Sequence, residues 1–211
     1  NPERFEEEIK LIIPEEGIDG KEEKKDAGKE SDLPEELPIL PLRESVLYPK
    51  MLLPLMVTQE RLIRLIEAAV LANKKIGIVA LKSKDKDRED VVPEDLFPVG
   101  CGATILKMVK MPDGSLRLLI QGNVRIRLVE FTQREPFIRA RVLPLKDEGE
   151  KTEMQGLMAA VKGIFQKVVE LAPNLPGELA IMAMNLEEPG ALADLIASTL
   201  NFPFAAKQEI L

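Results

Sequence analysis

The chain has 211 residues and a formal net charge of −7, with one Cys, one Tyr and neither Trp nor His. The absence of His excludes Ser-His-Asp and Cys-His catalysis and any imidazole metal site. A single Cys excludes an internal disulfide, so nothing indicates a secreted, disulfide-stapled fold. The longest mainly apolar run, Met51 to Val57, has seven residues, whereas a membrane-spanning helix needs about 20. We therefore expect a cytoplasmic protein with no membrane partner.

Acidic residues are concentrated in residues 1–36, where fourteen Asp and Glu stand against six Lys and Arg. The remaining residues, 37–211, hold 22 acidic and 23 basic side chains and are close to neutral. A segment so charged and so poor in apolar residues is typical of a solvated, mobile leader. We therefore expect residues 1–36 to form an acidic leader ahead of the folded body.

Residues 37–146 carry mostly strand patterns. Leu37–Leu42 and Met51–Val57 are apolar, and proline interrupts both of them, as it does in strands at sheet edges. Between these strands and the buried strand predicted at Ile76–Leu81, the segment Gln59–Asn73 repeats apolar residues at helical spacing. Thr58 is the candidate N-cap of that helix.

From Val99 to residue 145 the apolar residues alternate with polar ones, which indicates strands with one buried and one wet face. Pro112-Asp113-Gly114 predicts a hairpin turn, and Gly122-Asn123 allows a second reversal of the chain. We therefore expect a mainly antiparallel, small β-barrel-like lobe with one helix over residues 37–146.

From residue 151 the apolar period becomes helical, so residues 151–211 are predicted to form a C-terminal helical bundle. Pro173 ends the first helix, and Pro176, Pro189 and Pro203 each fit the first turn of a further helix. The last helix has only about eight residues before the chain stops, which is marginal for a helix alone and suggests a helix cut from a longer protein. The expected fold class is thus α+β.

Motifs that carry chemistry are few. The sequence contains neither a Gly-x-x-x-x-Gly-Lys-Ser/Thr loop nor a Gly-x-Gly-x-x-Gly loop for phosphate binding. Cys101 is interpreted as a small buried hydrophobe, because no cationic neighbour in sequence would activate its thiol. We expect no catalytic residue, no metal site and no bound cofactor in these residues, and so no enzyme activity of their own.

Two surfaces are candidates for binding. Apolar side chains near turns are suited to holding unfolded chains, because Met is flexible and adapts to varied partners. The candidate substrate-binding residues are Tyr48, Met51, Leu53, Met56, Phe97, Met108 and Met111. Arginines gathered on the wet face of the sheet would instead bind nucleic-acid phosphates, weakly because the body is near neutral. These are Arg117, Arg125, Arg127, Arg139 and Arg141.

Several short motifs follow one another in a specific order over residues 37–211. They are Leu40-Pro41-Leu42-Arg43, Tyr48-Pro49, Pro54-Leu55-Met56-Val57, Asp95-Leu96-Phe97-Pro98-Val99-Gly100, Ile105-Leu106-Lys107-Met108, Pro112-Asp113-Gly114, Gln121-Gly122-Asn123-Val124-Arg125, Glu188-Pro189-Gly190-Ala191-Leu192-Ala193-Asp194 and Lys207-Gln208-Glu209-Ile210-Leu211. Their order and spacing resemble the amino-terminal, substrate-recognition domain of the ATP-dependent Lon protease family.

The resemblance implies a PUA-like β-lobe followed by a helical bundle, and a role in recognising unfolded or damaged proteins for degradation. In the family this region precedes a AAA+ ATPase module and a Ser-Lys protease module, so ATP and Mg²⁺ are expected in those parts. The implied partners are protein substrates and the other subunits of a ring oligomer, a hexamer in the family. A strand edge would add backbone pairing to an extended substrate. A free-standing Lon-like adaptor and a nucleic-acid-binding module are the alternatives.

Overall fold

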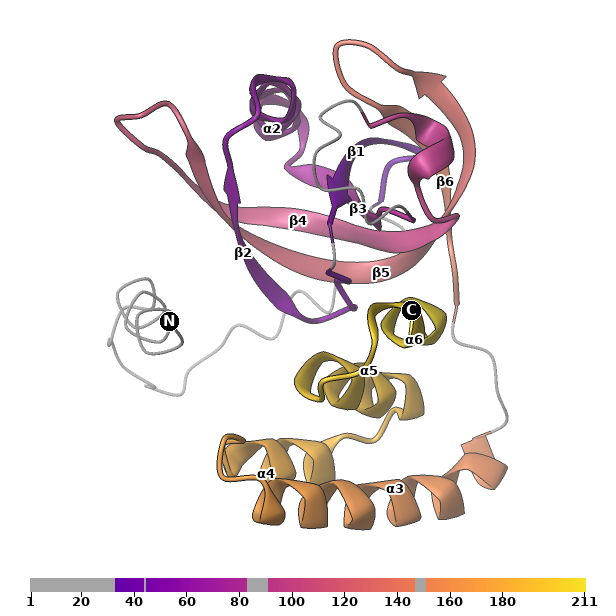
Figure 1. Cartoon of the computed structure of the whole chain (residues 1–211). Coiled ribbons are helices and arrows are strands. Elements are labelled where there is room, and N and C mark those ends of the chain that lie inside the picture. Colours follow the sequence, from indigo (N-terminus) through magenta and orange to yellow (C-terminus); the bar gives the residue numbers. More distant parts are fainter. Residues whose placement is uncertain (1–32, 44, 83–90, 147–150) are drawn as a thin grey trace, which may run out of the picture. The chain divides into compact units, whose positions relative to one another are not determined.

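The computed structural model describes residues 33–43, 45–82, 91–146 and 151–211, the side chains of residues 151–153 excepted (Figure 1). Residues 1–32 of the predicted acidic leader lie outside the described residues. Residues Leu33–Leu211 form one compact unit, in which all strands precede four of the five α-helices. The α+β class is confirmed, while the functional division at residues 36 and 146 stays a prediction.

Six strands form one curled sheet in the order β2-β5-β4-β3-β1-β6, and β6 also pairs with β5. The strands β5, β4, β3, β1 and β6 therefore close into a barrel-like ring, and β2 lies outside this ring, paired with β5. All neighbours run antiparallel except β1 and β3. The strands are β1 (Glu36–Leu42), β2 (Leu52–Val57), β3 (Lys75–Ala80), β4 (Val99–Lys110), β5 (Leu116–Gln133) and β6 (Arg139–Pro144).

Strand β5 differs from the prediction, because Gly122 and Asn123 do not reverse the chain and β5 is one strand of 18 residues. Gly122 instead allows the backbone around Tyr48 to approach β5 closely. A Cβ on Gly122 would lie 2.2 Å from the carbonyl oxygen of Tyr48. The Gly122 N–H donates to the Met51 carbonyl, and its own carbonyl accepts from the Lys50 N–H. Gly122 thus lets the segment before β2 lie directly against β5.

Helix α2 (Glu60–Ala72) packs against β1 and β3 and completes the main core. Leu65, Ile66 and Ala69 recur at helical spacing and join the largest cluster of buried apolar residues. The N-cap prediction is wrong by one residue. Gln59 occupies that position, in extended backbone conformation and without a side-chain cap bond. A short 3₁₀-helix, η2 (Pro93–Asp95), precedes β4.

Four helices follow the sheet: α3 (Lys151–Leu171), α4 (Glu178–Asn185), α5 (Pro189–Thr199) and α6 (Phe204–Ile210). Helix α3 packs on α4 and α5, and α5 packs on α6. Pro189 opens α5 as predicted, whereas Pro176 lies before the N-cap of α4 and Pro203 is itself the N-cap of α6. None of the helices described is long and apolar enough to cross a membrane.

Candidate functional site

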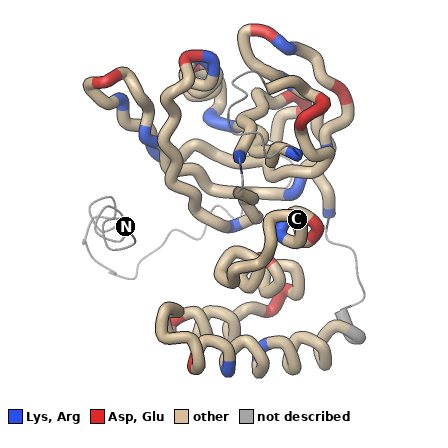
Figure 2. The backbone as a smooth tube through the Cα atoms, in the orientation of Figure 1, with Lys and Arg blue, Asp and Glu red and all other residues tan. Residues whose placement is uncertain are grey.

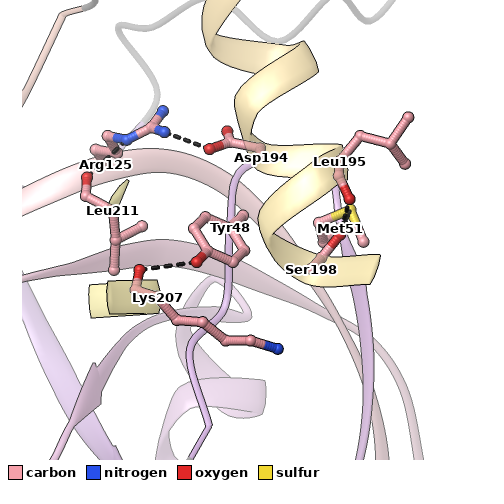
Figure 3. Close-up of polar contacts among 8 residues, drawn as sticks. All are labelled: Tyr48, Met51, Arg125, Asp194, Leu195, Ser198, Lys207 and Leu211. Atoms are coloured by element: carbon pink, nitrogen blue, oxygen red, sulfur yellow. Dashed lines mark hydrogen bonds and ion pairs between the residues drawn. The ribbon is translucent and has the colours of Figure 1, made fainter. Parts of the chain in front are cut away.

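Helices α5 and α6 contact the sheet around Arg125 of β5 (Figure 3). The Arg125 guanidinium forms an ion pair with the Asp194 carboxylate of α5, and its Nε donates to the Leu211 carbonyl at 2.7 Å. The Gln208 side-chain amide of α6 donates to the Val99 carbonyl of β4 at 3.1 Å. These bonds satisfy polar groups that the contact removes from water. We call this contact between α5, α6 and the sheet the junction.

Tyr48, a predicted substrate contact, lies in the junction and not on the surface. Its side chain is 1% exposed, and its hydroxyl donates to the Lys207 carbonyl of α6 at 2.7 Å (Figure 3). Burial raises the pKa of Tyr48 to about 12. The ring is therefore buried in packing, and a substrate contact of Tyr48 stays a prediction.

Two further predicted contacts also belong to the junction. The Ser198 hydroxyl of α5 points at the Met51 sulfur, 3.9 Å away (Figure 3). Phe97 packs edge to face on Phe204 of α6, with ring centroids 6.0 Å apart. These side chains hold the helices against the sheet, so neither is available as a free substrate-binding surface.

The other four predicted residues are scattered. Leu53 packs against the barrel core, and Met111 lies half-buried in the hairpin turn. Met108 is 37% exposed, but its register with Leu118 places it on the core-facing side of the hairpin. Met56 lies on the opposite, outer side and is 66% exposed. The seven predicted residues thus do not form one site.

The structure instead assembles an apolar patch on the outer face of β2, β5 and β4. Outward residues of β2 stand opposite outward residues of β5, in the pairs Leu52–Gln121, Pro54–Leu119 and Met56–Arg117. Val109 of β4 lies on the same face across from Arg117. Leu52 and Val109 are 52% and 44% exposed. We call Leu52, Pro54, Met56, Val109 and Leu119 the outer patch.

The border of the outer patch is basic. Lys107 and Arg117 lie on its face, while β2 and β4 contain no Asp or Glu, and Figure 2 shows β2 without charge. The exception is the Asp113 carboxylate in the hairpin turn: the Ser115 hydroxyl and N–H donate to it at 2.6 Å and 2.9 Å, and these bonds together with the charge of Arg117 lower its pKa. The patch therefore suits apolar segments that are neutral or acidic.

The arginines predicted as a nucleic-acid face do not gather in one place. Arg125 is held in the junction. Arg139 and Arg141 form ion pairs with glutamates of β1 and β5, at 2.5 Å and 2.8 Å. Arg117 borders the outer patch, and Arg127 is exposed ten positions further along β5. A continuous phosphate-binding surface is therefore absent among these five side chains.

Sequence reasoning missed Leu119 and Val109, and it left Leu52, an apolar residue noted near a turn, out of the predicted site. Leu119 has the same parity on its strand as Arg117 and Gln121, which the alternation predicts to face outward. A leucine at an outward position was therefore visible in the sequence. The sequence did not show that Leu119 belongs to a patch, because only the pairing of β5 with β2 and β4 brings Val109 and Leu52 beside it.

Cys101 is fully buried, and burial raises the pKa of its thiol to about 12. A thiol that stays protonated at neutral pH is no nucleophile. Within the described part of the chain, no three His, Cys, Asp or Glu side chains are grouped so that they could hold a metal ion. The outer patch is the candidate functional site, because its exposed apolar side chains can bind an apolar ligand.

Comparisons with known proteins agree on one family. Residues 36–211 match the family described as the ATP-dependent protease La (LON) substrate-binding domain. The Lon protease of Dictyoglomus thermophilum is 45% identical over 190 residues, which are 90% of this chain and 24% of that protein. The Lon protease of Desulfosudis oleivorans is 37% identical over 185 residues, 87% of this chain and 22% of that protein. The chain thus spans about a quarter of the length of these relatives.

Solved structures show the same fold. The N-terminal domain of the Mycobacterium avium complex Lon protease matches with a TM-score of 0.67 and 17% identity, over 82% of this chain and 88% of that chain. A Lon N-terminal domain protein from Xanthomonas campestris matches with a TM-score of 0.56 and 18% identity, over the same shares of the two chains. At these identities the likeness concerns the fold alone.

Proposed function

The chain belongs to the family of Lon protease substrate-binding domains, and we propose that its outer patch recruits unfolded or damaged polypeptides to a longer ATP-dependent protease. The observation that carries the proposal is the outer patch itself. Three half-exposed apolar side chains lie on β2 and β4, the two strands that flank β5, and they form a surface that a folded protein gains nothing by exposing. Family membership favours this function over a nucleic-acid-binding module.

The size of the patch supports weak binding. Covering each half-exposed Leu, Met or Val contributes about 1 kcal/mol of hydrophobic free energy, before the cost of association. A handful of such side chains gives a complex that forms and dissociates readily. Several copies in one assembly would raise the effective concentration of substrate without tight binding at any single site. Weak single sites also allow release into the later steps.

The remaining activities are proposed to lie in other parts of the longer protein. We propose that a AAA+ module there uses ATP and Mg²⁺, that a Ser-Lys peptidase cleaves the substrate, and that the subunits form a cytoplasmic ring, with six members as the resemblance implies. Residues 1–211 support this division because they contain no phosphate-binding loop.

Fluorescence anisotropy of a labelled, permanently unfolded protein tests the proposal. The label is on the ligand because the chain has no Trp. The double variant Leu52→Gln/Met56→Gln makes two outer-patch side chains polar at similar size, and we expect it to bind about tenfold more weakly. The matched control is Ile181→Gln/Met182→Gln, which changes two comparably exposed apolar residues of α4.

The control variant is expected to bind like the unchanged chain. Equal weakening by both doubles would mean that exposed apolar residues anywhere on the surface suffice. No weakening by the outer-patch double would refute the proposed site. A labelled nucleic acid, titrated at two salt concentrations, is expected to show no specific binding.

A further inference from the structure

Strand β2 is an edge strand. Among the strands in the described residues, β5 is its one partner. An edge strand presents backbone N–H and C=O groups on its outer side, where another extended chain can pair. Whether β2 offers such groups depends on which of its residues bond to β5.

Hydrogen bonds at the two ends of the pairing fix this pattern. The Gly122 N–H donates to the Met51 carbonyl at 2.9 Å, which joins these residues across β2 and β5. In the hairpin with β4, the Met111 N–H donates to the Ser115 carbonyl, so odd-numbered residues of this part of β5 bond to β4. Even-numbered residues of β5 therefore bond to β2, and they stand opposite Leu53, Leu55 and Val57.

Leu52, Pro54 and Met56 consequently direct their backbone polar groups away from β5. They offer three carbonyl acceptors but only two N–H donors, because proline has none. The two donors stand four residues apart, about 13 Å along the strand. A proline in the middle of an exposed edge limits pairing and so guards against aggregation. The edge thus allows a short, weak pairing.

The same three residues also supply the β2 part of the outer patch. An extended chain that pairs with this edge would place alternate side chains beside Leu52 and Met56. Lys107 on the same face favours neutral or acidic side chains in that chain. Backbone bonding, apolar contact and charge therefore all point to one occupant, an extended apolar polypeptide segment without basic residues.

We propose that the free edge of β2, from Leu52 to Met56, takes such a segment of a substrate as an added β-strand. Backbone bonds at Leu52 and Met56 hold it, and the outer patch receives its apolar side chains. This inference rests on the proposed function and deepens it, since it states how the bound substrate is held and which substrates fit. Backbone pairing explains tolerance of sequence, because every residue except proline can supply it.

Two variants at Met56 separate the contribution of its backbone N–H to binding from the contribution of its side chain. Met56→Ala removes the side chain and keeps the outward N–H, whereas Met56→Pro removes both. The Met56 N–H does not bond to β5, so proline there spares the ladder. The probe is a dye-labelled peptide of about ten residues with alternating Val and Thr and one Glu. We expect Met56→Pro to bind it about two- to tenfold more weakly than Met56→Ala.

Pro54→Ala tests the same edge in the opposite direction. It adds a third outward donor, and we expect about two- to tenfold tighter binding of the peptide. A peptide carrying N-methyl groups at alternate residues, which removes its donors on one edge, is expected to lose binding. A peptide with Lys in place of Glu is expected to bind more weakly, most clearly at low salt.

The outcomes distinguish the two proposals. Equal binding by Met56→Pro and Met56→Ala, no gain from Pro54→Ala and unchanged binding of the N-methyl peptide would refute strand addition. The apolar contact of the proposed function would then still stand if the Leu52→Gln/Met56→Gln variant weakens binding of the unfolded protein. If the strand-addition tests fail and the Leu52→Gln/Met56→Gln variant also binds the unfolded protein as well as the unchanged chain does, both proposals are refuted. If Met56→Pro fails to fold, Pro54→Ala and the N-methyl peptide decide whether strand addition occurs.

Discussion

Tyr48 joins the sheet to α6 through its one polar atom. Its ring fills the junction, and its hydroxyl bonds to the Lys207 carbonyl in the last turn of the described chain. A buried hydroxyl without a partner would be costly, so the helix carbonyl and the tyrosine satisfy each other. At the scale of the residue, this bond decides that Tyr48 serves structure and not substrate binding.

Tyr48→Phe should therefore lower the free energy of unfolding by about 0.5–1.5 kcal/mol at neutral pH and leave peptide binding unchanged. The pKa of Tyr48 is raised from 10.0 to about 12. The stabilisation linked to this protonated hydroxyl is thus fully present below pH 10 and lost as the pH rises towards about 12. Urea unfolding followed by circular dichroism should show the gap between the two proteins closing over that range. A gap that stays constant would contradict the account.

The residues of the site were only partly predictable. Which of the candidate residues are exposed was not predictable: Met56 is 66% exposed, whereas Tyr48, Met51 and Phe97, which resemble it in the sequence, contact α5 or α6. All four are apolar side chains near turns. What separates them is which element packs over each one, and no local pattern encodes that.

Elements were predicted best where the pattern is local. Alternation located the start of β5, the Pro112-Asp113-Gly114 turn located the hairpin that joins it to β4, and Pro189 located the start of α5. Gly122 misled the prediction, because a Gly-Asn pair is a turn motif, whereas here the glycine makes room for a distant backbone segment. The edge position expected from proline is confirmed for β2 but is wrong for β1, which pairs with both β3 and β6.

Gly122 is needed for β2 to reach its place beside β5. Gly122→Ala brings a Cβ within 2.2 Å of the Tyr48 carbonyl oxygen, so backbone must move. We expect a loss of about 1–3 kcal/mol in unfolding free energy and weaker substrate binding, because β2 carries three of the five outer-patch residues. Urea unfolding and anisotropy measure the two effects.

Gly156→Ala in α3 is the matched control. A Cβ at Gly156 meets nothing within 4 Å, and alanine favours the helix by about 0.5–1 kcal/mol. This variant should be more stable than the unchanged chain and bind substrate equally well. A comparable loss from both glycine substitutions would mean that the close contact at Gly122 is not the cause.

At the scale of the whole molecule, the junction makes the sheet and the helices one compact unit. Arg125 and Asp194 are both largely buried, with side chains 13% and 5% exposed. The β4–β5 register shifts between Gly102 and Ala103, so Arg125, which pairs with Cys101, lies on the opposite face of β5 from Leu119. The junction and the outer patch therefore occupy different faces of β5.

Asp194→Ala should cost about 3–5 kcal/mol of unfolding free energy, because it removes the carboxylate that balances the buried Arg125 charge. The double variant Arg125→Ala/Asp194→Ala removes both charges, so it should lose less than the sum of the two single variants. Urea unfolding of all four proteins gives this coupling energy. Additive losses would show that the pair does not hold the junction.

The most direct measurement of the central claim is methyl NMR of the chain with ¹³C-labelled methionine, titrated with an unfolded protein. The eight methionines report on separate surfaces: Met56 on the outer patch, Met51 in the junction, Met182 and Met184 on the exposed side of α4. We predict that the Met56 signal shifts or broadens at the lowest ligand concentrations, while Met51, Met182 and Met184 stay unchanged. A response of Met182 and Met184 with none at Met56 would contradict the account and move substrate binding to the helices.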